Sequence, residues 1–143
     1  MTTSEPPALA QIEELLAEKG YEVAELENGL LKVSDPDTGV SFRAALEGNV
    51  LDISVTLTTV PAGAITPELM WKMLAADNGI STSSFKLVET GGKVAITLNN
   101  FCTLQNMGAE DQDDVLSLAS YLMADLLEAR ELLEPVNPTA ERG

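Results

Sequence analysis

One continuous segment, Thr66 to Leu133, constrains the fold more than any other part of the sequence. Thr66 and Pro67 predict the start of a helix, because a threonine hydroxyl accepts a hydrogen bond from a free amide of the first turn and proline suits the first helical position. Asn78-Gly79 predicts the end of that helix, since both residue types tolerate the left-handed backbone conformation that follows many helices. The segment therefore begins with a helix over 67–78.

A hairpin and a long helix follow in the same segment. Gly91-Gly92 predicts a two-residue turn, because consecutive glycines tolerate the positive φ angles of a tight connection. We expect strands over 85–89 and 93–99 to pair across this turn. Two acidic residues then predict the start of a helix over 110–133, since carboxylates complement the positive end of the helix dipole.

The first half of the sequence adds one helix and several strands. Ala8 to Lys19 has apolar residues at helical spacing and is followed by Gly20, which ends the helix. Val50 to Thr59 alternates apolar and polar residues, which is typical of a strand with one buried face. The other expected strands are 30–33 and 40–46, and 21–26 is either a short strand or an extended lead-in.

These elements together predict an α+β fold. The order is helix, three to four strands, helix, two strands, helix, which favours one mainly antiparallel sheet with helices packed on it. We expect a single domain over 8–134, with flexible tails at 1–7 and 135–143.

Charge and composition exclude several classes of function. The net charge of −15, from 23 acidic and 8 basic residues, repels phosphate backbones and anionic lipid, so we expect no nucleic-acid partner and no membrane partner. No apolar run approaches the ~20 residues of a membrane span. The first residues lack the basic and apolar regions of a secretory signal, which predicts a cytoplasmic location. With one cysteine, Cys102, and no histidine, neither an internal disulfide nor an ordinary zinc site is expected.

Two short motifs imitate functional sequences. Asp37-Thr38-Gly39 matches the signature of aspartic proteases, but the preceding Ser34-Asp35-Pro36 favours an exposed hairpin turn. Gly91-Gly92-Lys93 resembles the end of a phosphate-binding loop, but Leu87 stands where the first glycine is required. We interpret both motifs as turns.

The remaining candidate groups are acidic residues and the single thiol. An acidic cluster, Glu110, Asp111, Asp113 and Asp114, either complements a helix N-terminus or holds a hard cation, and the first role is the commoner one. A second acidic set, Asp125, Glu128 and Glu131, is interpreted as a solvated helix face. Without a histidine neighbour, Cys102 is interpreted as a packing residue. No catalytic residue, metal or cofactor is predicted.

Two helices carry more apolar surface than one sheet face can cover. In the 67–78 helix, Met70, Met73 and Leu74 are expected to form the buried stripe, and other apolar residues point elsewhere. In the last helix the expected stripe is Val115, Leu118, Ala119, Leu122, Leu126 and Leu133. Burial within the chain and dimerisation both remain open explanations of the surplus. The candidate dimer or partner interface consists of Leu69, Trp71, Leu116, Met123 and Leu127.

The pattern of apolar positions and turns resembles two related families. The run Met73 to Asn78, then Phe85-Lys86-Leu87, then Gly91 to Leu98 and the long final helix is similar to the second half of bacterial type III secretion chaperones. It is also similar to the YbjN-like family of sensory-regulator-like proteins, which shares that fold. The resemblance spans roughly residues 8 to 133. It implies a small, acidic, cytoplasmic homodimer without enzymatic activity, which holds an extended segment of an unidentified protein partner.

Two alternatives come from other classes of function. A small hydrolase or isomerase would need a pocket that gathers carboxylates from the set Asp52, Glu89, Asp111 and Asp114 around an apolar cavity. A regulatory domain would instead bind a small molecule.

Overall fold

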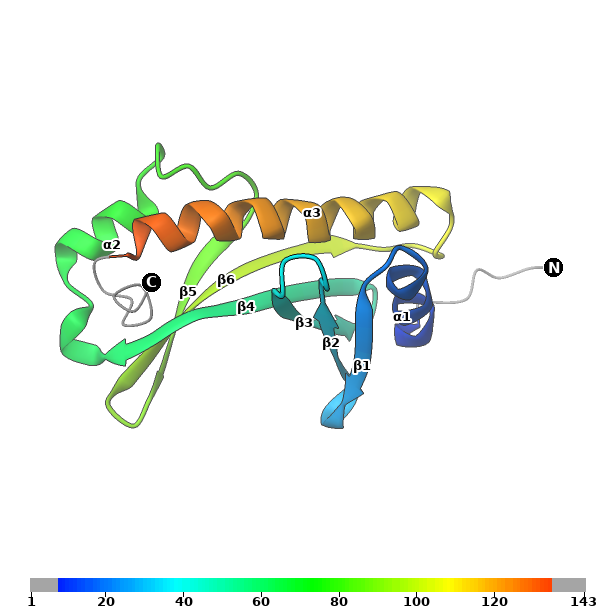
Figure 1. Ribbon diagram of the computed structural model, residues 1–143, viewed down its shortest axis with the longest axis horizontal. Coiled ribbons are helices and arrows are strands. Elements are labelled where there is room, and N and C mark those ends of the chain that lie inside the picture. Colours follow the sequence, from blue (N-terminus) through cyan, green and yellow to red (C-terminus); the bar gives the residue numbers. More distant parts are fainter. Residues whose placement is uncertain (1–7, 135–143) are drawn as a thin grey trace. The chain divides into compact units, whose positions relative to one another are not determined.

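The computed structural model describes residues 8–134 and contains three α-helices and six strands (Figure 1). In chain order the elements are α1 (Leu9–Glu18), β1 (Glu22–Leu26), the 3-10 turn η1 (Glu27–Gly29), β2 (Leu30–Ser34), β3 (Ser41–Glu47), β4 (Val50–Pro61), the 3-10 turn η2 (Ala62–Ala64), α2 (Pro67–Leu74), β5 (Ser84–Thr90), β6 (Lys93–Thr103) and α3 (Ala109–Leu132). The predicted tails, 1–7 and 135–143, lie outside the described residues.

The six strands form one antiparallel sheet in the order β1-β2-β3-β4-β6-β5, so β1 and β5 are its edge strands. The α+β class and the predicted element order are therefore confirmed, with four strands before α2. The chain divides into two compact units. The first unit contains residues 8–54 and 100–120, and the second contains 55–99 and 121–134, so that β4, β6 and α3 each contribute to both. A single domain over 8–134 stays a prediction.

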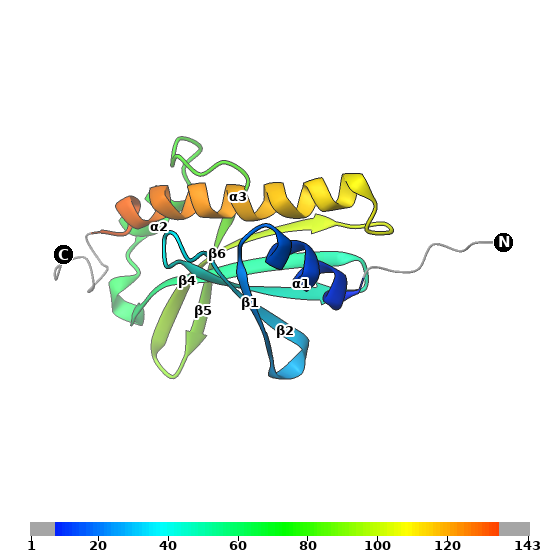
Figure 2. The ribbon, with the colours of Figure 1, turned by 45° about the vertical axis from the view of Figure 1, so that its right-hand side comes forward.

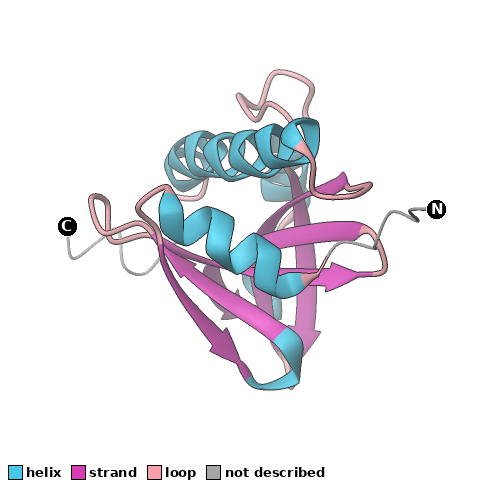
Figure 3. Cartoon of the chain, turned by 90° about the vertical axis from the view of Figure 1, so that its right-hand side faces the viewer, coloured by secondary structure: helices cyan, strands magenta, loops and turns pink. Residues whose placement is uncertain are grey.

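In the first unit, α1 contributes one apolar face to a core. Its buried residues Ile12, Leu15 and Leu16 follow the predicted spacing, and Gly20, with a φ of 97°, ends the helix as expected. Figure 2 shows α1 beside β1, and Figure 3 views the same helix in front of the strands. The strands β1 to β4 pair as successive antiparallel neighbours. They bury Leu31, Val33, Phe42, Ala44, Leu51 and Ile53.

In the second unit, the β5–β6 hairpin forms as predicted. Gly91 and Gly92 have φ angles of 57° and 82°, values that L side chains rarely adopt, and Thr90 pairs with Lys93 directly beside the turn. The buried cluster of this unit consists of Val60, Leu69, Met73, Ile96 and Leu133. Here α2 packs through an i, i+4 pair, Leu69 and Met73.

The predicted helix over 67–78 is too long. The helix α2 ends at Leu74, and Ala75 has an extended conformation with a ψ of 144°. The Asn78 side-chain amide reaches back and donates a hydrogen bond to the Met73 carbonyl oxygen at 2.6 Å. Asn78 therefore caps the helix with its side chain, although its backbone already belongs to the loop after α2.

The predicted alternation of β4 holds for only part of the strand. Leu51 and Ile53 are buried as expected, but Val55 and Leu57 are only half-buried, and beyond them the buried residues are Thr58 and Val60. The buried side therefore changes from odd-numbered to even-numbered positions. In β6 the predicted alternation is confirmed, because Val94, Ile96 and Leu98 are all buried.

Candidate functional site

The largest exposed apolar side chains of the second unit include two from α2 and one from α3. Trp71 is 78% exposed, Leu74 is 77% exposed and Leu127 is 63% exposed. Helical geometry explains the two on α2: Leu69 and Met73 occupy the core-facing side, and residues two and five positions after Leu69 point well away from that side. The short helix thus presents an apolar face to solvent.

A hollow of about 780 Å³ lies along this face of α2. Most of its lining is apolar: Pro67, Met70, Trp71, Leu74, Ala75 and Ala76. Asp77 is the charged residue at its edge. We call this site the apolar hollow.

A second hollow, of about 480 Å³, shares Trp71, Ala75 and Asp77 with the first. The rest of its lining is mainly polar and comes from α2, the loop after it and the C-terminal part of α3, which lie side by side in Figure 1: Lys72, Asn78, Glu128, Glu131 and Leu132. We call it the acidic hollow, because three carboxylates and one ammonium group line it. The ammonium group of Lys72 lies 3.8 Å from Glu68 Oε1 in an exposed i, i+4 pair. Such a pair contributes little stability. It does, however, direct part of the Lys72 charge to Glu68, which does not line the hollow.

The loop between α2 and β5 is held to α3 by one buried carboxylate. The Ser81 amide and hydroxyl both donate to Asp125 Oδ1 at 2.8 Å, and the Ser83 amide donates to Asp125 Oδ2 at 3.0 Å. Burial by itself raises the pKa of Asp125, but these hydrogen bonds outweigh it and the pKa lies below its ordinary value. Asp125 therefore remains ionised and fixes the loop that contributes to both hollows.

The interpretation of Asp125, Glu128 and Glu131 as one solvated helix face is wrong at Asp125. Its side chain is only 2% exposed, whereas Glu128 and Glu131 are exposed. The available signal was the serine-rich run Ser81 to Ser84, which offers several donors to a carboxylate. Sequence reasoning also missed Leu74 and Asp77 as surface residues of the two hollows.

The structure separates the five residues of the candidate interface. Trp71 and Leu127 are exposed, whereas Leu116, in the first unit, and Met123, in the second, are half-buried. Leu69 was wrongly placed at the surface: it is 6% exposed and belongs to the buried cluster of the second unit. The buried stripe assigned to Met70, Met73 and Leu74 is confirmed at Met73 only, because Met70 is half-buried and Leu74 is exposed. The helix α2 turns its Leu69–Met73 side inward. The stripe predicted for α3 is confirmed at all six positions.

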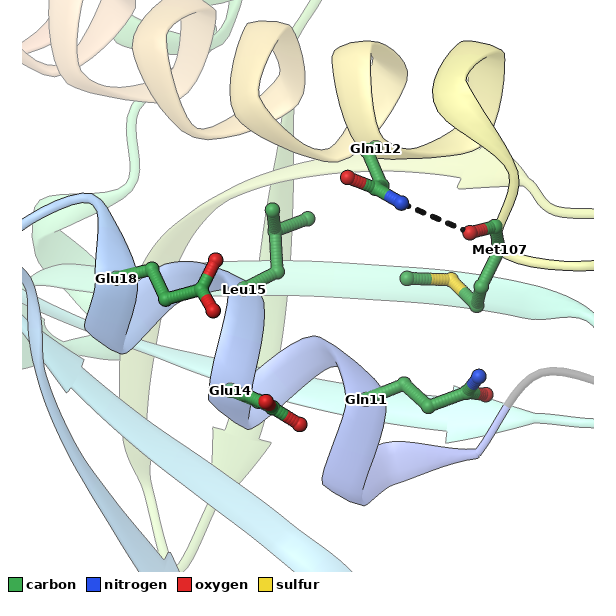
Figure 4. Close-up of a pocket in the computed structure, with 6 residues that line it drawn as sticks. All are labelled: Gln11, Glu14, Leu15, Glu18, Met107 and Gln112. Carbon is green, nitrogen blue, oxygen red and sulfur yellow. Dashed lines mark hydrogen bonds between the residues drawn. The ribbon is translucent and has the colours of Figure 1, made fainter.

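The first unit has a smaller hollow of about 210 Å³ (Figure 4). Gln11, Glu14, Leu15 and Glu18 from α1 line it, together with Met107 and Gln112. The Gln112 side-chain amide donates to the Met107 carbonyl oxygen at 3.0 Å, as the dashed line in Figure 4 shows. Both glutamates are exposed to solvent, so this hollow is open and polar.

Asp111 organises the turn before α3. Its Oδ2 accepts hydrogen bonds from the amides of Gln105, Asn106 and Met107 at 2.7, 2.8 and 2.8 Å. Burial raises the pKa of this carboxyl, but the three backbone donors lower it further, so the net pKa is below the ordinary value. Its carboxylate is therefore used to accept hydrogen bonds from these backbone amides. Within residues 8–134, no three His, Cys, Asp or Glu side chains are grouped so that they could hold a metal ion.

Cys102 is a half-buried free thiol near the same turn. Burial, and then the negative charges of Asp114 and Asp111, raise its pKa to about 11. The thiol therefore stays protonated at neutral pH, the state opposite to that of a nucleophilic cysteine.

This protonation state predicts slow alkylation of the folded protein. At about pH 8, iodoacetamide should modify Cys102 roughly 100-fold more slowly than a cysteine with its ordinary pKa, because the thiolate fraction falls tenfold for each pKa unit. Mass spectrometry of timed samples measures the rate, and the same protein in denaturant is the control that should react at the ordinary rate. Equal rates in the folded and unfolded protein would contradict the prediction.

The carboxylates of the enzymatic alternative do not gather in any of the three hollows described above. Asp52, Glu89 and Asp114 are exposed, and Asp111 is occupied by backbone donors. The protease-like motif is an exposed turn, as expected: the Asp35 carboxylate accepts hydrogen bonds from the Asp37 amide and the Thr38 hydroxyl. Among residues 8–134, no helix has the length and hydropathy to cross a membrane.

Comparisons with known proteins give a likeness in fold. No family model matches the sequence, and no curated protein matches it. Among solved structures, the chain is similar to the crystal structure of YbjN, a candidate transcription regulator from E. coli, with a TM-score of 0.64 and 15% sequence identity. The likeness covers 87% of this chain and 90% of YbjN. The resemblance to YbjN is thus confirmed for the fold, and at this identity the likeness shows the fold alone.

Proposed function

We propose that this chain is a non-enzymatic protein-binding module that holds a polypeptide partner on the exposed apolar face of α2. The observation that carries the proposal is the exposure of Trp71 and Leu74 beside the apolar hollow. Tryptophan is the residue type most enriched at the energetic centres of interfaces, and groups of exposed large apolar side chains mark interaction sites.

The rigidity of the supporting loop favours the same proposal. Three hydrogen bonds to Asp125 and one from Asn78 to the end of α2 hold the residues that line the hollows. A surface that is already ordered loses less conformational entropy when a partner binds.

Self-association is a further part of the proposal. Leu127 is exposed and Met123 is half-buried, and both lie on the part of α3 that belongs to the second unit, so this part of the helix supplies apolar area for contact with a second copy of the chain. The resemblance to the secretion chaperones also implies a homodimer, and the same resemblance underlies the proposed cytoplasmic location.

The proposal predicts two separable effects of single substitutions. Light scattering of the purified protein should give twice 15.2 kDa, and Leu127→Glu should lower that mass towards one chain. In affinity capture from lysate of the native host, Trp71→Glu should lose protein partners that the wild type retains.

Val88→Glu is the matched control, because Val88 is also a half-exposed apolar residue but lies on β5. It should keep both the dimer mass and the captured partners, and circular dichroism should show all three variants folded. A wild type that is monomeric at high concentration would disprove the dimer. Equal capture by the wild type and by Trp71→Glu would disprove the role of α2.

A further inference from the structure

We propose that the partner segment held on α2 is basic and amphipathic, with an apolar side chain in the apolar hollow and a lysine or arginine in the acidic hollow. This inference rests on the proposed function and specifies the chemistry of the partner. It follows from the way in which two hollows of different character share Trp71.

The apolar hollow can take a large aliphatic or aromatic side chain. Trp71 and Leu74 flank it from α2, and the small residues Ala75 and Ala76 leave space beside them. An apolar side chain placed there would remove both large groups from water, and this burial favours binding.

The acidic hollow begins on the other side of Trp71 and attracts positive charge. Asp77, Glu128 and Glu131 line it, and within residues 8–134 none of these three forms an ion pair. The Glu128 carboxylate lies close to Gly79 in the loop, since a Cβ added at Gly79 would lie 2.9 Å from Glu128 Oε2. A cationic side chain next to the apolar anchor would therefore meet three carboxylates.

Charge also argues against a second copy of the chain, nucleic acid or anionic lipid as the occupant of the two hollows. A second copy docked on these two hollows by two-fold symmetry would bring the carboxylates that line them towards one another. Nucleic acid and anionic lipid have the same sign of charge as this surface. A basic peptide is the occupant that complements both hollows.

Fluorescence titration with model peptides tests the inference, because Trp71 is the only tryptophan in the chain. The probe is a tryptophan-free peptide of about fourteen residues, with leucines at helical spacing and lysines elsewhere. Its binding should shift Trp71 emission to shorter wavelength, and the affinity should fall as salt is added. In the double variant Glu128→Gln, Glu131→Gln the dissociation constant should rise about tenfold at low salt, since two attractive charges are lost.

Matched controls separate this site from the general attraction between an acidic protein and a basic peptide. The double variant Glu47→Gln, Glu89→Gln removes the same charge from exposed positions outside the hollow and should bind like the wild type. A peptide with serine in place of leucine should bind without the emission shift.

Three results would overturn the inference. Equal weakening by the two double variants would assign the attraction to net charge alone. If a peptide of leucines and glutamates bound as tightly as the peptide of leucines and lysines, the site would bind peptides without selecting their charge. The proposed function would then stand while this inference failed. The absence of any emission shift with the leucine and lysine peptide would also overturn it, and the capture experiment with Trp71→Glu would still decide the proposed function separately.

Discussion

Replacement of Asp111 by alanine is expected to lower the free energy of unfolding by about 3 kcal/mol. The carboxylate accepts three backbone hydrogen bonds at the turn before α3, and hydrogen bonds to a charged group contribute about 1.5 to 3 kcal/mol each. The total is smaller than the sum, because Gln105 and Asn106 are exposed and water can replace part of what is lost. Urea unfolding followed by circular dichroism measures the change.

Asp113→Ala is the matched control for this effect. Asp113 lies on the same first turns of α3 but is exposed, so its loss should change the free energy of unfolding by about 0.5 kcal/mol or less. If the two variants were equally stable, Asp111 would have no special role in holding the turn.

The substitution Asp125→Asn should destabilise the protein by about 2 to 3 kcal/mol near neutral pH and should remove part of its acid sensitivity. The variant loses the charge that strengthens the hydrogen bonds from Ser81 and Ser83 and leaves one of these donors poorly paired. Because the folded pKa of Asp125 lies below its ordinary value of 3.8, the unfolded chain takes up the proton first as the pH falls. The contribution of Asp125 is therefore complete above about pH 4 and is lost as the pH falls towards its folded pKa.

Urea unfolding at about pH 6 and about pH 3 tests both parts of this prediction. The difference in stability between the wild type and Asp125→Asn should be large at the higher pH and should shrink at the lower one. Glu131→Gln, an exposed substitution on the same helix, should leave the difference between the two pH values unchanged. A constant gap between the wild type and Asp125→Asn at both pH values would contradict the assignment.

Elements with strong local signals could be predicted from the sequence. The hairpin at Gly91-Gly92 depends on the backbone freedom of two adjacent residues, and the inward face of β6 follows from strict alternation. The long stripe on α3 extends over several turns, so that only one helical phase places all its apolar residues together. Each of these signals is contained within the element that it specifies.

Features that depend on distant partners have no signal within their own element. Asp125 is buried because Ser81 donates to it from 44 residues away, and nothing near Asp125 in the sequence marks it as different from Glu128. The eight residues of α2 are too few to fix which apolar pair faces inward. The sequence therefore predicted Leu69 at the surface and Leu74 in the buried stripe, whereas Leu69 is buried and Leu74 is exposed. The two hollows likewise depend on the loop that Asp125 holds.

The edge position of β5 has a consequence for the behaviour of the protein at high concentration. All but one of its residues are exposed, among them the apolar pair Leu87 and Val88, and an open edge of this kind is a template for uncontrolled strand addition and aggregation. Lys86 and Glu89 bracket the apolar pair with charge, and charged side chains on an edge strand oppose its pairing with another sheet. Neutral apolar replacements at these two positions would make β5 the part of the molecule most prone to form fibrils.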